Sequence, residues 1–259
     1  MNYLLAPKHG RPVARAASSV SWCLVFLLTA AVFSFAFSQL HYGWNWGAIW
    51  QYRQKFLHGW LMTVAISAAA LLASLLIGLL TALARRSVFL PLRYSAMLYI
   101  ETARGTPLLV QILILFYVVA NAFGIENRYF VGALTLSMFA GAYLAEMIRS
   151  GIESIRDSQL ESARAIGLTH GQTYLYVIFP QVVRQLIPPL TGQFASIIKD
   201  SSLLSIIAVS EFTLNAQEVN AFTYSTLESY LPLAIGYLLL TLPVSLVSRI
   251  LERKFHYAT

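Results

Sequence analysis

The chain has 259 residues, of which 58% are hydrophobic and 11% are charged. A soluble domain contains about 45–50% apolar and about 25% charged residues, so the composition excludes an ordinary soluble protein and indicates an integral membrane protein. The net charge of +7 would suggest nucleic acid as the partner of a soluble protein, but here it indicates basic loops beside membrane lipid, and no nucleic-acid partner is expected.

Six stretches are apolar enough to cross a bilayer. A span needs roughly 20 mostly apolar residues, and backbone in lipid must satisfy its own hydrogen bonds, so each span should be a helix. The predicted spans are residues 20–40, 61–84, 94–120, 131–148, 186–209 and 231–248. The predicted fold is therefore an all-α integral membrane protein, a bundle of about six transmembrane helices.

Positive charge is distributed unequally between the two ends of these spans. One side holds Lys8, Arg11, Arg15, Arg85, Arg86, Arg93, Arg149, Arg156, Arg164, Arg184, Arg249, Arg253 and Lys254. The other side holds only Arg53, Lys55 and Arg128. Because cytoplasmic loops carry the excess of Lys and Arg, we expect both termini in the cytoplasm, as basic tails at 1–19 and 251–259, and the longest cytoplasmic loop at 149–185.

The first span has a second interpretation. Its basic flank, its apolar stretch and Ala36-Phe37-Ser38 together fit a cleavable signal peptide. The apolar stretch is about 20 residues, which is long for a signal and right for a span, so we expect it to be retained. Aromatic residues then follow up to about residue 56 and fit an external segment at the membrane interface.

The second span carries two rows of small residues spaced four apart. One row is Ala65, Ala69 and Ala73, and the other is Ser74 with Gly78. Such rows allow helices to approach closely in lipid, although alanine and glycine are also common in membrane helices without this role.

The long loop contains signals for a helix that ends at a glycine. Ser158 and Glu161 have the capping-box spacing, in which a hydroxyl and a carboxylate satisfy free amides at a helix start. Gly167 fits the left-handed position that follows a helix end. We therefore expect a short helix between these points.

A second short helix should follow the glycine. Thr169 and Gln172 repeat the capping-box spacing. Pro180 disfavours helical geometry in the residue before it, so this helix should end near Phe179. Together the two helices predict a helix–glycine–helix elbow on the cytoplasmic face.

The spacing of the elbow resembles a loop of the permease subunits of bacterial ATP-binding-cassette importers. That loop reads Glu-Ala-Ala, three residues, Gly, nine residues, Ile, one residue, Leu-Pro. The matching positions here are Glu161, Ser162, Ala163, Gly167, Val177, Phe179 and Pro180. Serine, valine and phenylalanine replace one alanine, the isoleucine and the leucine. The resemblance implies that this loop, with Ser158 at its start, is the coupling helix that sits in a cleft of the ATPase subunit.

The chain also resembles the polar amino-acid branch of that family, the histidine-, glutamine- and glutamate-type permeases. The matching stretches are residues 101–111, 140–152, 179–190 and 197–207. The resemblance covers about residues 57–250 and implies a five-helix permease core there, with residues 20–56 as an extra N-terminal span and external segment.

Charged residues inside the predicted spans are Glu101, Arg104, Glu146, Lys199 and Asp200. Charges at membrane depth are costly and usually face protein or water. Glu101 and Arg104 are three residues apart and can meet on one helix face. Glu146 and Arg149 have the same spacing. Such residues either line a solute path or pair with one another to hold the bundle together.

The position of Lys199 depends on where the fifth span begins. Pro188 and Pro189 suit the first turn of that helix. Lys199 would then lie about 16 Å farther along the axis, near the membrane midplane.

The solute-path hypothesis gives these side chains specific roles. Arg104 would bind the carboxylate of an amino acid through a paired fork, and Asp200 or Glu101 would bind its ammonium group. The candidate path residues are Glu101, Arg104, Gln111, Lys199, Asp200, Ser201 and Ser202, the last two and Gln111 through neutral hydrogen bonds.

The sequence lacks the motifs of an enzyme. It has no Gly-x-x-x-x-Gly-Lys phosphate loop and no His/Cys cluster with metal-ligand spacing, so we expect no ATP site, metal or cofactor in this chain. The resemblance implies a bacterial inner-membrane permease that takes up polar amino acids. Its implied partners are a second permease chain, identical or a sister, two ATPase subunits that bind ATP and Mg²⁺, and an extracytoplasmic solute-binding protein. The alternative is an ion-coupled secondary transporter, although the halves show no inverted repeat.

Overall fold

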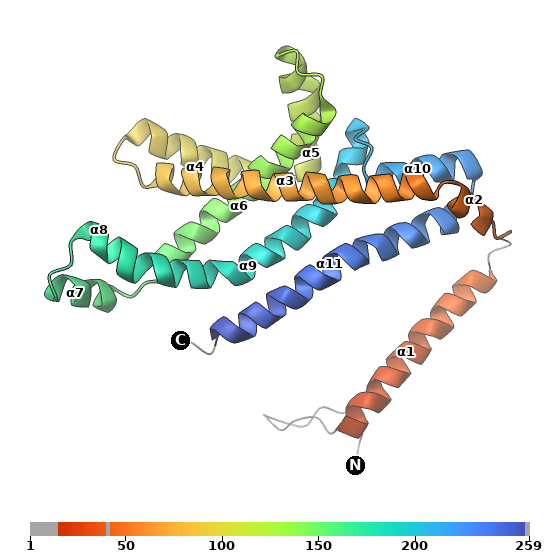
Figure 1. The fold of residues 1–259 in the computed structure, drawn as a ribbon, viewed down its shortest axis with the longest axis horizontal. Coiled ribbons are helices and arrows are strands. Elements are labelled where there is room, and N and C mark those ends of the chain that lie inside the picture. The colour runs from red at the N-terminus through yellow and green to blue at the C-terminus, as the bar shows by residue number, and fades with distance from the viewer. Residues whose placement is uncertain (1–14, 40–41, 257–259) are drawn as a thin grey trace. The chain divides into compact units, whose positions relative to one another are not determined.

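The computed structural model describes residues 15–39 and 42–256, and the predicted tail residues Lys8 and Arg11 lie outside them. The described chain is helical, without strands (Figure 1). Its elements are α1 (Arg15–Ser38), α2 (Trp46–Gln51), α3 (Arg53–Arg85), α4 (Leu90–Gly105), α5 (Leu108–Leu113), the π-helix η1 (Ile114–Ala120), α6 (Arg128–Glu153), α7 (Asp157–Ala165), α8 (His170–Thr173), the π-helix η2 (Tyr174–Ile178), α9 (Phe179–Asp200), the 3₁₀-helix η3 (Ser201–Ile207), α10 (Phe212–Thr223) and α11 (Thr226–His256). The all-α membrane fold is therefore confirmed.

The chain divides into two compact units, residues 1–44 and 45–259. The first unit contains α1, the predicted first span. Large apolar side chains cover this helix and are exposed, among them Trp22, Phe26 and Leu28. A helix that is apolar all round suits a lipid environment.

Four helices of the described chain are long and apolar enough to cross a membrane, namely α1, α3, α6 and α11. The helices α4 and α5–η1 pass the same test together, but the chain bends by 114° between them. The structure therefore supports four such spans, or five if the bent pair counts as one.

The single helix predicted over residues 94–120 is wrong. The α4 helix ends at Gly105, and Thr106 is extended, with φ −118° and ψ 147°. Pro107 then precedes α5. A proline disfavours helical geometry in the residue before it, and here Thr106 leaves the helix and the chain turns.

The prediction that the elbow's second helix ends near Phe179 is wrong. The helices α8, η2 and α9 follow one another without a break from His170 to Asp200. The Phe179 amide bonds to the carbonyl of Tyr174, five residues back, so a π-helical turn precedes Pro180 and places it in the first turn of α9. A wider turn accommodates the missing proline amide without ending the helix.

The predicted start of the fifth span is also wrong. Pro188 and Pro189 lie inside α9 instead of at its first turn. Lys199 lies in the last turn, about 30 Å along the axis from Phe179 at 1.5 Å per residue. The start at Pro188, from which a midplane position was inferred for Lys199, is therefore not the start of this helix.

The most extensive packing between two helices of the described chain joins α3 to α6. Ser74 and Gly78 are buried on α3, whereas Ala65 and Ala69 are exposed, so only one of the two small-residue rows makes this contact. A side chain built on Gly78 would place its Cβ 2.6 Å from Leu144 Cβ. The absence of a side chain at Gly78 therefore sets how closely the two backbones approach.

We expect Gly78→Val to lower the free energy of unfolding by about 1–3 kcal/mol, because the new side chain would overpack the contact between α3 and α6. Thermal unfolding in detergent measures this loss. Gly192→Val is the matched control, because a Cβ on Gly192 meets nothing within 4 Å. Equal melting temperatures for the two variants would contradict the prediction.

Candidate functional site

A hollow of about 440 Å³ lies between α4, α6 and α9. Its lining residues are Arg104, Tyr143, Glu146, Met147, Arg149, Ser150, Gly151, Ser154, Gln185, Leu186 and Pro189. Charged and hydroxyl groups make up much of this list, although the helices that carry them belong to a membrane protein. Such a lining suits a polar solute or water.

Glu146 is the centre of the charges in this hollow. Its carboxylate lies 2.7 Å from the guanidinium of Arg85 on α3 and 2.5 Å from that of Arg149 one turn along α6. Arg104 on α4 is 3.6 Å away. The Arg149 guanidinium also pairs with Glu153. The predicted pairing of Glu146 with Arg149 is present, and one carboxylate joins three helices.

The predicted contact between Glu101 and Arg104 is not among the salt bridges of the described residues. Arg104 turns instead to Glu146, and its guanidinium carbon lies 5.5 Å from the centre of the Tyr143 ring. Glu101 is exposed on α4. Arg104 contacts α6 instead of Glu101 because α6 places both a carboxylate, Glu146, and an aromatic ring, Tyr143, beside it.

A second hollow of about 300 Å³ adjoins the first. It is lined by Phe139, Tyr143, Gln193, Ser196, Lys199 and Asp200. Tyr143 lines both hollows, so α6 connects them. The structure thus places two of the predicted path residues, Lys199 and Asp200, beside one cavity and Arg104 beside the other.

The other predicted path residues line neither hollow. The hydroxyls of Ser201 and Ser202 donate to the carbonyls of Ile198 and Lys199 at 2.8 and 2.6 Å, so both are engaged by their own helix. Their contact with a solute therefore has no support in this geometry.

Gln111 has a structural task that the sequence did not suggest. Its side-chain amide donates to the carbonyl of Ala103 at 2.8 Å, and to the carbonyl and hydroxyl of Thr106 at 3.1 and 2.9 Å. These bonds satisfy carbonyls that the end of α4 leaves free. Gln111 therefore fixes the bend between α4 and α5.

We expect Gln111→Leu to lower the free energy of unfolding by about 1–3 kcal/mol, because it leaves carbonyls at the bend unsatisfied. Gln217→Leu is the control, since Gln217 is exposed on α10. Chemical denaturation of the two variants in detergent tests this. A midpoint for Gln111→Leu equal to that of the control would show that the bend does not depend on Gln111.

Sequence reasoning missed Tyr143, Gln193 and Ser196, which line the two hollows, and Arg85, which pairs with Glu146. It searched for charges within spans, and Arg85 lies at a span end while the other three are neutral. Tyr143 stands inside the stretch 140–152 that carried the family resemblance, and that position was the available signal.

A buried carboxylate outside the hollows was missed as well. Glu211 is fully buried before α10, and its oxygens accept from the amides of Thr213 and Leu214, each at 2.8 Å. The hydroxyl of Tyr237 on α11 donates to it at 3.0 Å. Glu211 thus caps α10 and ties it to α11, which is a structural role.

The elbow loop folds around Gly167. This residue has φ +79°, and its amide and that of Leu168 bond back to the carbonyls of Arg164 and Ala163. This is the Schellman pattern, in which a left-handed residue closes a helix. The capping box of Thr169 with Gln172 is also present at the start of α8.

The capping box predicted for Ser158 and Glu161 is wrong. The α7 helix begins at Asp157, and Arg156 at its N-cap makes no side-chain hydrogen bond. Asp157 supplies a carboxylate in the first turn, where the helix dipole favours negative charge. The backbone carbonyl of Ser158 instead accepts a hydrogen bond from the hydroxyl of Ser162.

Four of the predicted coupling residues gather at one shallow hollow of about 360 Å³. They are Ser158, Ser162, Ala163 and Val177, and Ile166 beside them is 77% exposed. Glu161 and Gly167 are exposed and Pro180 is half-buried. The loop therefore presents small and apolar groups outward, which suits contact with another protein.

The family described as the binding-protein-dependent transport system inner membrane component matches residues 74–257. The chain belongs to this family. It is 35% identical over 212 residues to the glutamine transport system permease protein GlnP of Escherichia coli (strain K12), which covers 81% of this chain and 97% of that protein. It is 39% identical over 194 residues to the L-cystine transport system permease protein TcyB of Bacillus subtilis (strain 168), covering 74% and 82% respectively.

Solved structures agree with the family. An amino acid ABC transporter crystallised with histidines matches with a TM-score of 0.77 and 33% identity, over 82% of this chain and 100% of that chain. The methionine transporter MetNI in an inward-facing conformation matches with a TM-score of 0.61 and 15% identity, which shows the fold alone. The predicted resemblance to importer permeases is confirmed, and the chain is a transport subunit of the inner membrane whose family works with an ATPase and a binding protein.

Proposed function

We propose that this permease forms the path for polar amino acids in an ATP-driven importer. The observation that carries the proposal is the pair of hollows joined at Tyr143, which offer opposite charges to one solute. Arg104 and Lys199 suit a carboxylate, and Asp200 suits an ammonium group. Relatives named for glutamine and cystine transport support this substrate class.

The proposal includes the assembly and its energy source. A second permease chain, identical or a sister, would complete the path. Two ATPase subunits would bind ATP and Mg²⁺ and contact the exposed face of α7, while this chain would bind no cofactor. The basic loops and both termini of this chain would lie in the cytoplasm. A solute-binding protein would deliver the amino acid from the opposite side of the membrane.

Uptake of labelled amino acids into liposomes tests the proposal. The liposomes hold this chain with its ATPase and binding protein, and uptake should require ATP and all three components. Uptake by the chain alone, driven by a proton or sodium gradient, would support the secondary transporter instead.

Asp200→Asn should raise the KM for uptake about tenfold or more, because a charge-assisted hydrogen bond to the ammonium group is lost. ATP hydrolysis by the complex should persist. Glu126→Gln is the control, since Glu126 is exposed in the connection before α6 and lines neither hollow. An unchanged KM for Asp200→Asn would exclude Asp200 from the path.

A further inference from the structure

A fourth hollow, of about 500 Å³, lies behind the elbow loop and shares no lining residue with the hollows at Arg104 and at Asp200. It is lined by Arg86, Ile152, Glu153, Ile155, Asp157, Leu160, Arg164, Leu168, Thr169, His170, Thr173, Tyr174 and Ile178. These residues come from the end of α3, the end of α6, and the loop with α7 and α8. One part of the wall is apolar and the other is basic.

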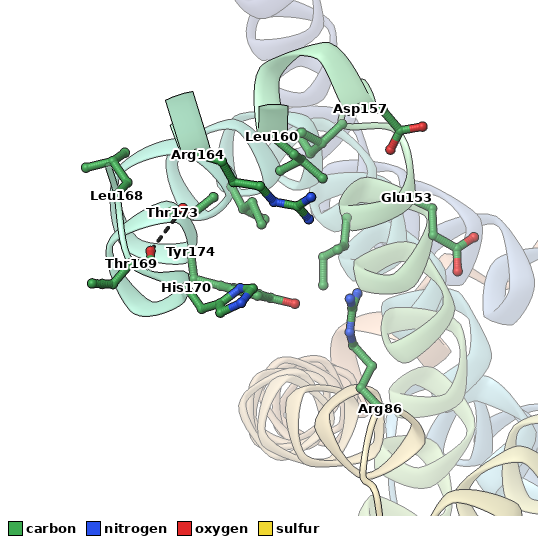
Figure 2. Close-up of a pocket in the computed structure, with 13 residues that line it drawn as sticks. Arg86, Glu153, Asp157, Leu160, Arg164, Leu168, Thr169, His170, Thr173 and Tyr174 are labelled. Atoms are coloured by element: carbon green, nitrogen blue, oxygen red, sulfur yellow. Dashed lines mark hydrogen bonds between the residues drawn. The ribbon is translucent and has the colours of Figure 1, made fainter. Parts of the chain in front are cut away.

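The basic groups converge on this hollow. In Figure 2 the guanidinium groups of Arg86 and Arg164 and the ring of His170 are directed into it from three sides, and the Tyr174 hydroxyl lies beside them. The guanidinium carbon of Arg86 lies 5.9 Å from the centre of the Tyr174 ring. The described salt bridges include none that pairs Arg86, Arg164 or His170 with a carboxylate.

The two acidic residues of the lining do not neutralise these groups. The carboxylates of Glu153 and Asp157 are directed away from the centre of the hollow (Figure 2). Glu153 already pairs with Arg149, which lies one turn earlier on the same face of α6 and does not line this hollow. The hollow therefore holds an excess of positive charge and donors, which is the lining of an anion site.

The position of Arg86 indicates where the anion comes from. Arg86 directly follows α3, one of the helices long enough to span the membrane, so one wall of the hollow is formed at the end of a candidate span. Basic hollows beside the ends of membrane helices suit anionic lipid head groups. Apolar residues such as Ile155 and Leu160 offer the rest of the wall to a glycerol or acyl segment.

We propose that this hollow binds a phosphate group, and that the phosphate belongs to an anionic phospholipid such as phosphatidylglycerol. The lipid would hold the elbow loop against the membrane end of α3. The proposed lipid site does not depend on the transported solute. Lipid binding and amino-acid uptake are therefore tested by separate experiments.

Native mass spectrometry of the full chain in neutral detergent tests the site, with phosphatidylglycerol and phosphatidylcholine as competing probes. Wild type should retain phosphatidylglycerol preferentially. Removing each arginine should weaken that binding about fivefold, so Arg86→Gln/Arg164→Gln should weaken it about 25-fold. Binding of phosphatidylcholine should not change. Arg93→Gln/Arg156→Gln is the matched control, because both residues are exposed and neither lines the hollow.

His170→Gln, with both arginines kept, is a milder variant and should also weaken binding of phosphatidylglycerol. Thermal unfolding of each variant shows whether it is folded. A preference that survives in the double variant, or is absent in wild type, would overturn the proposal. Displacement of the lipid by excess soluble glycerol phosphate would identify a free anion as the ligand and overturn the lipid assignment. Loss of the lipid when the ATPase binds would show that the hollow belongs to the ATPase interface.

Discussion

Glu146→Gln is expected to lower the free energy of unfolding by about 2–4 kcal/mol and to abolish transport. The variant leaves the guanidinium groups of Arg85, Arg104 and Arg149 close together without a shared counter-charge. Removing one partner of a largely buried ion pair costs about 3–5 kcal/mol, and we reduce that figure because the Glu146 side chain is 22% exposed. Chemical denaturation in detergent and uptake by the assembled complex measure the two effects.

The reason for the loss can be separated from general damage. If repulsion among the arginines is the cause, a second substitution, Arg85→Gln, should recover about 0.5–3 kcal/mol in the Glu146→Gln background. Glu153→Gln is the control, because the Glu153 side chain is 57% exposed and Arg149 is its one salt-bridge partner among the described residues. Two results would contradict a central role for Glu146 in the cluster. One is that the losses of unfolding free energy for Glu146→Gln and Arg85→Gln simply add in the double variant, and the other is that Glu146→Gln and Glu153→Gln lose equal amounts.

Gly167→Val is expected to uncouple the permease from its ATPase while the membrane helices stay folded. Gly167 has φ +79°, a conformation that costs a residue with a Cβ about 1–2 kcal/mol and a β-branched residue still more. The chain offers no steric obstacle, since a Cβ there meets nothing within 4 Å. Valine would therefore act on the backbone, and the loop would pay that cost whenever it adopts the shape the ATPase binds.

The expected result is ATPase binding about 5- to 30-fold weaker, with uptake reduced in parallel. Co-purification at graded protein concentrations measures the first effect, and liposome uptake the second. Gly167→Asn is the matched control, because asparagine tolerates the left-handed conformation and should retain most of both activities. Normal uptake by Gly167→Val would contradict a coupling role for the loop. Equal loss in both variants would instead point to close approach of the ATPase at this position.

The features that were predicted correctly depend on residues that are close together in the sequence. Gly167 and the capping box of Thr169 with Gln172 were correct because a helix end and a helix start depend on a few consecutive residues. The long spans were located because apolar length alone makes a membrane helix. The pairing of Glu146 with Arg149 is equally local, since one helical turn brings them together.

The failures arose where helices meet. Pro180, Pro188 and Pro189 were taken as helix boundaries, yet the helix continues through all three. Pro107 was placed inside a single predicted span, yet the chain breaks there. A proline removes one hydrogen bond, and whether the helix then stops depends on what the neighbouring residues and helices can satisfy. At the first break Gln111 stabilises the end of α4, whereas a π-helical turn carries the chain into Pro180.

The sequence by itself therefore determined the membrane environment, the approximate spans, the glycine-centred loop and the permease family, because each follows from composition or from short-range spacing. Only the tertiary structure decided which charges share a site. It paired Arg104 with Glu146 instead of Glu101, joined two hollows at Tyr143, and gathered Arg86, Arg164 and His170 behind the loop. These contacts join residues from separate helices, and their geometry depends on how closely those helices pack, which at α3 and α6 is set by the absent side chain of Gly78.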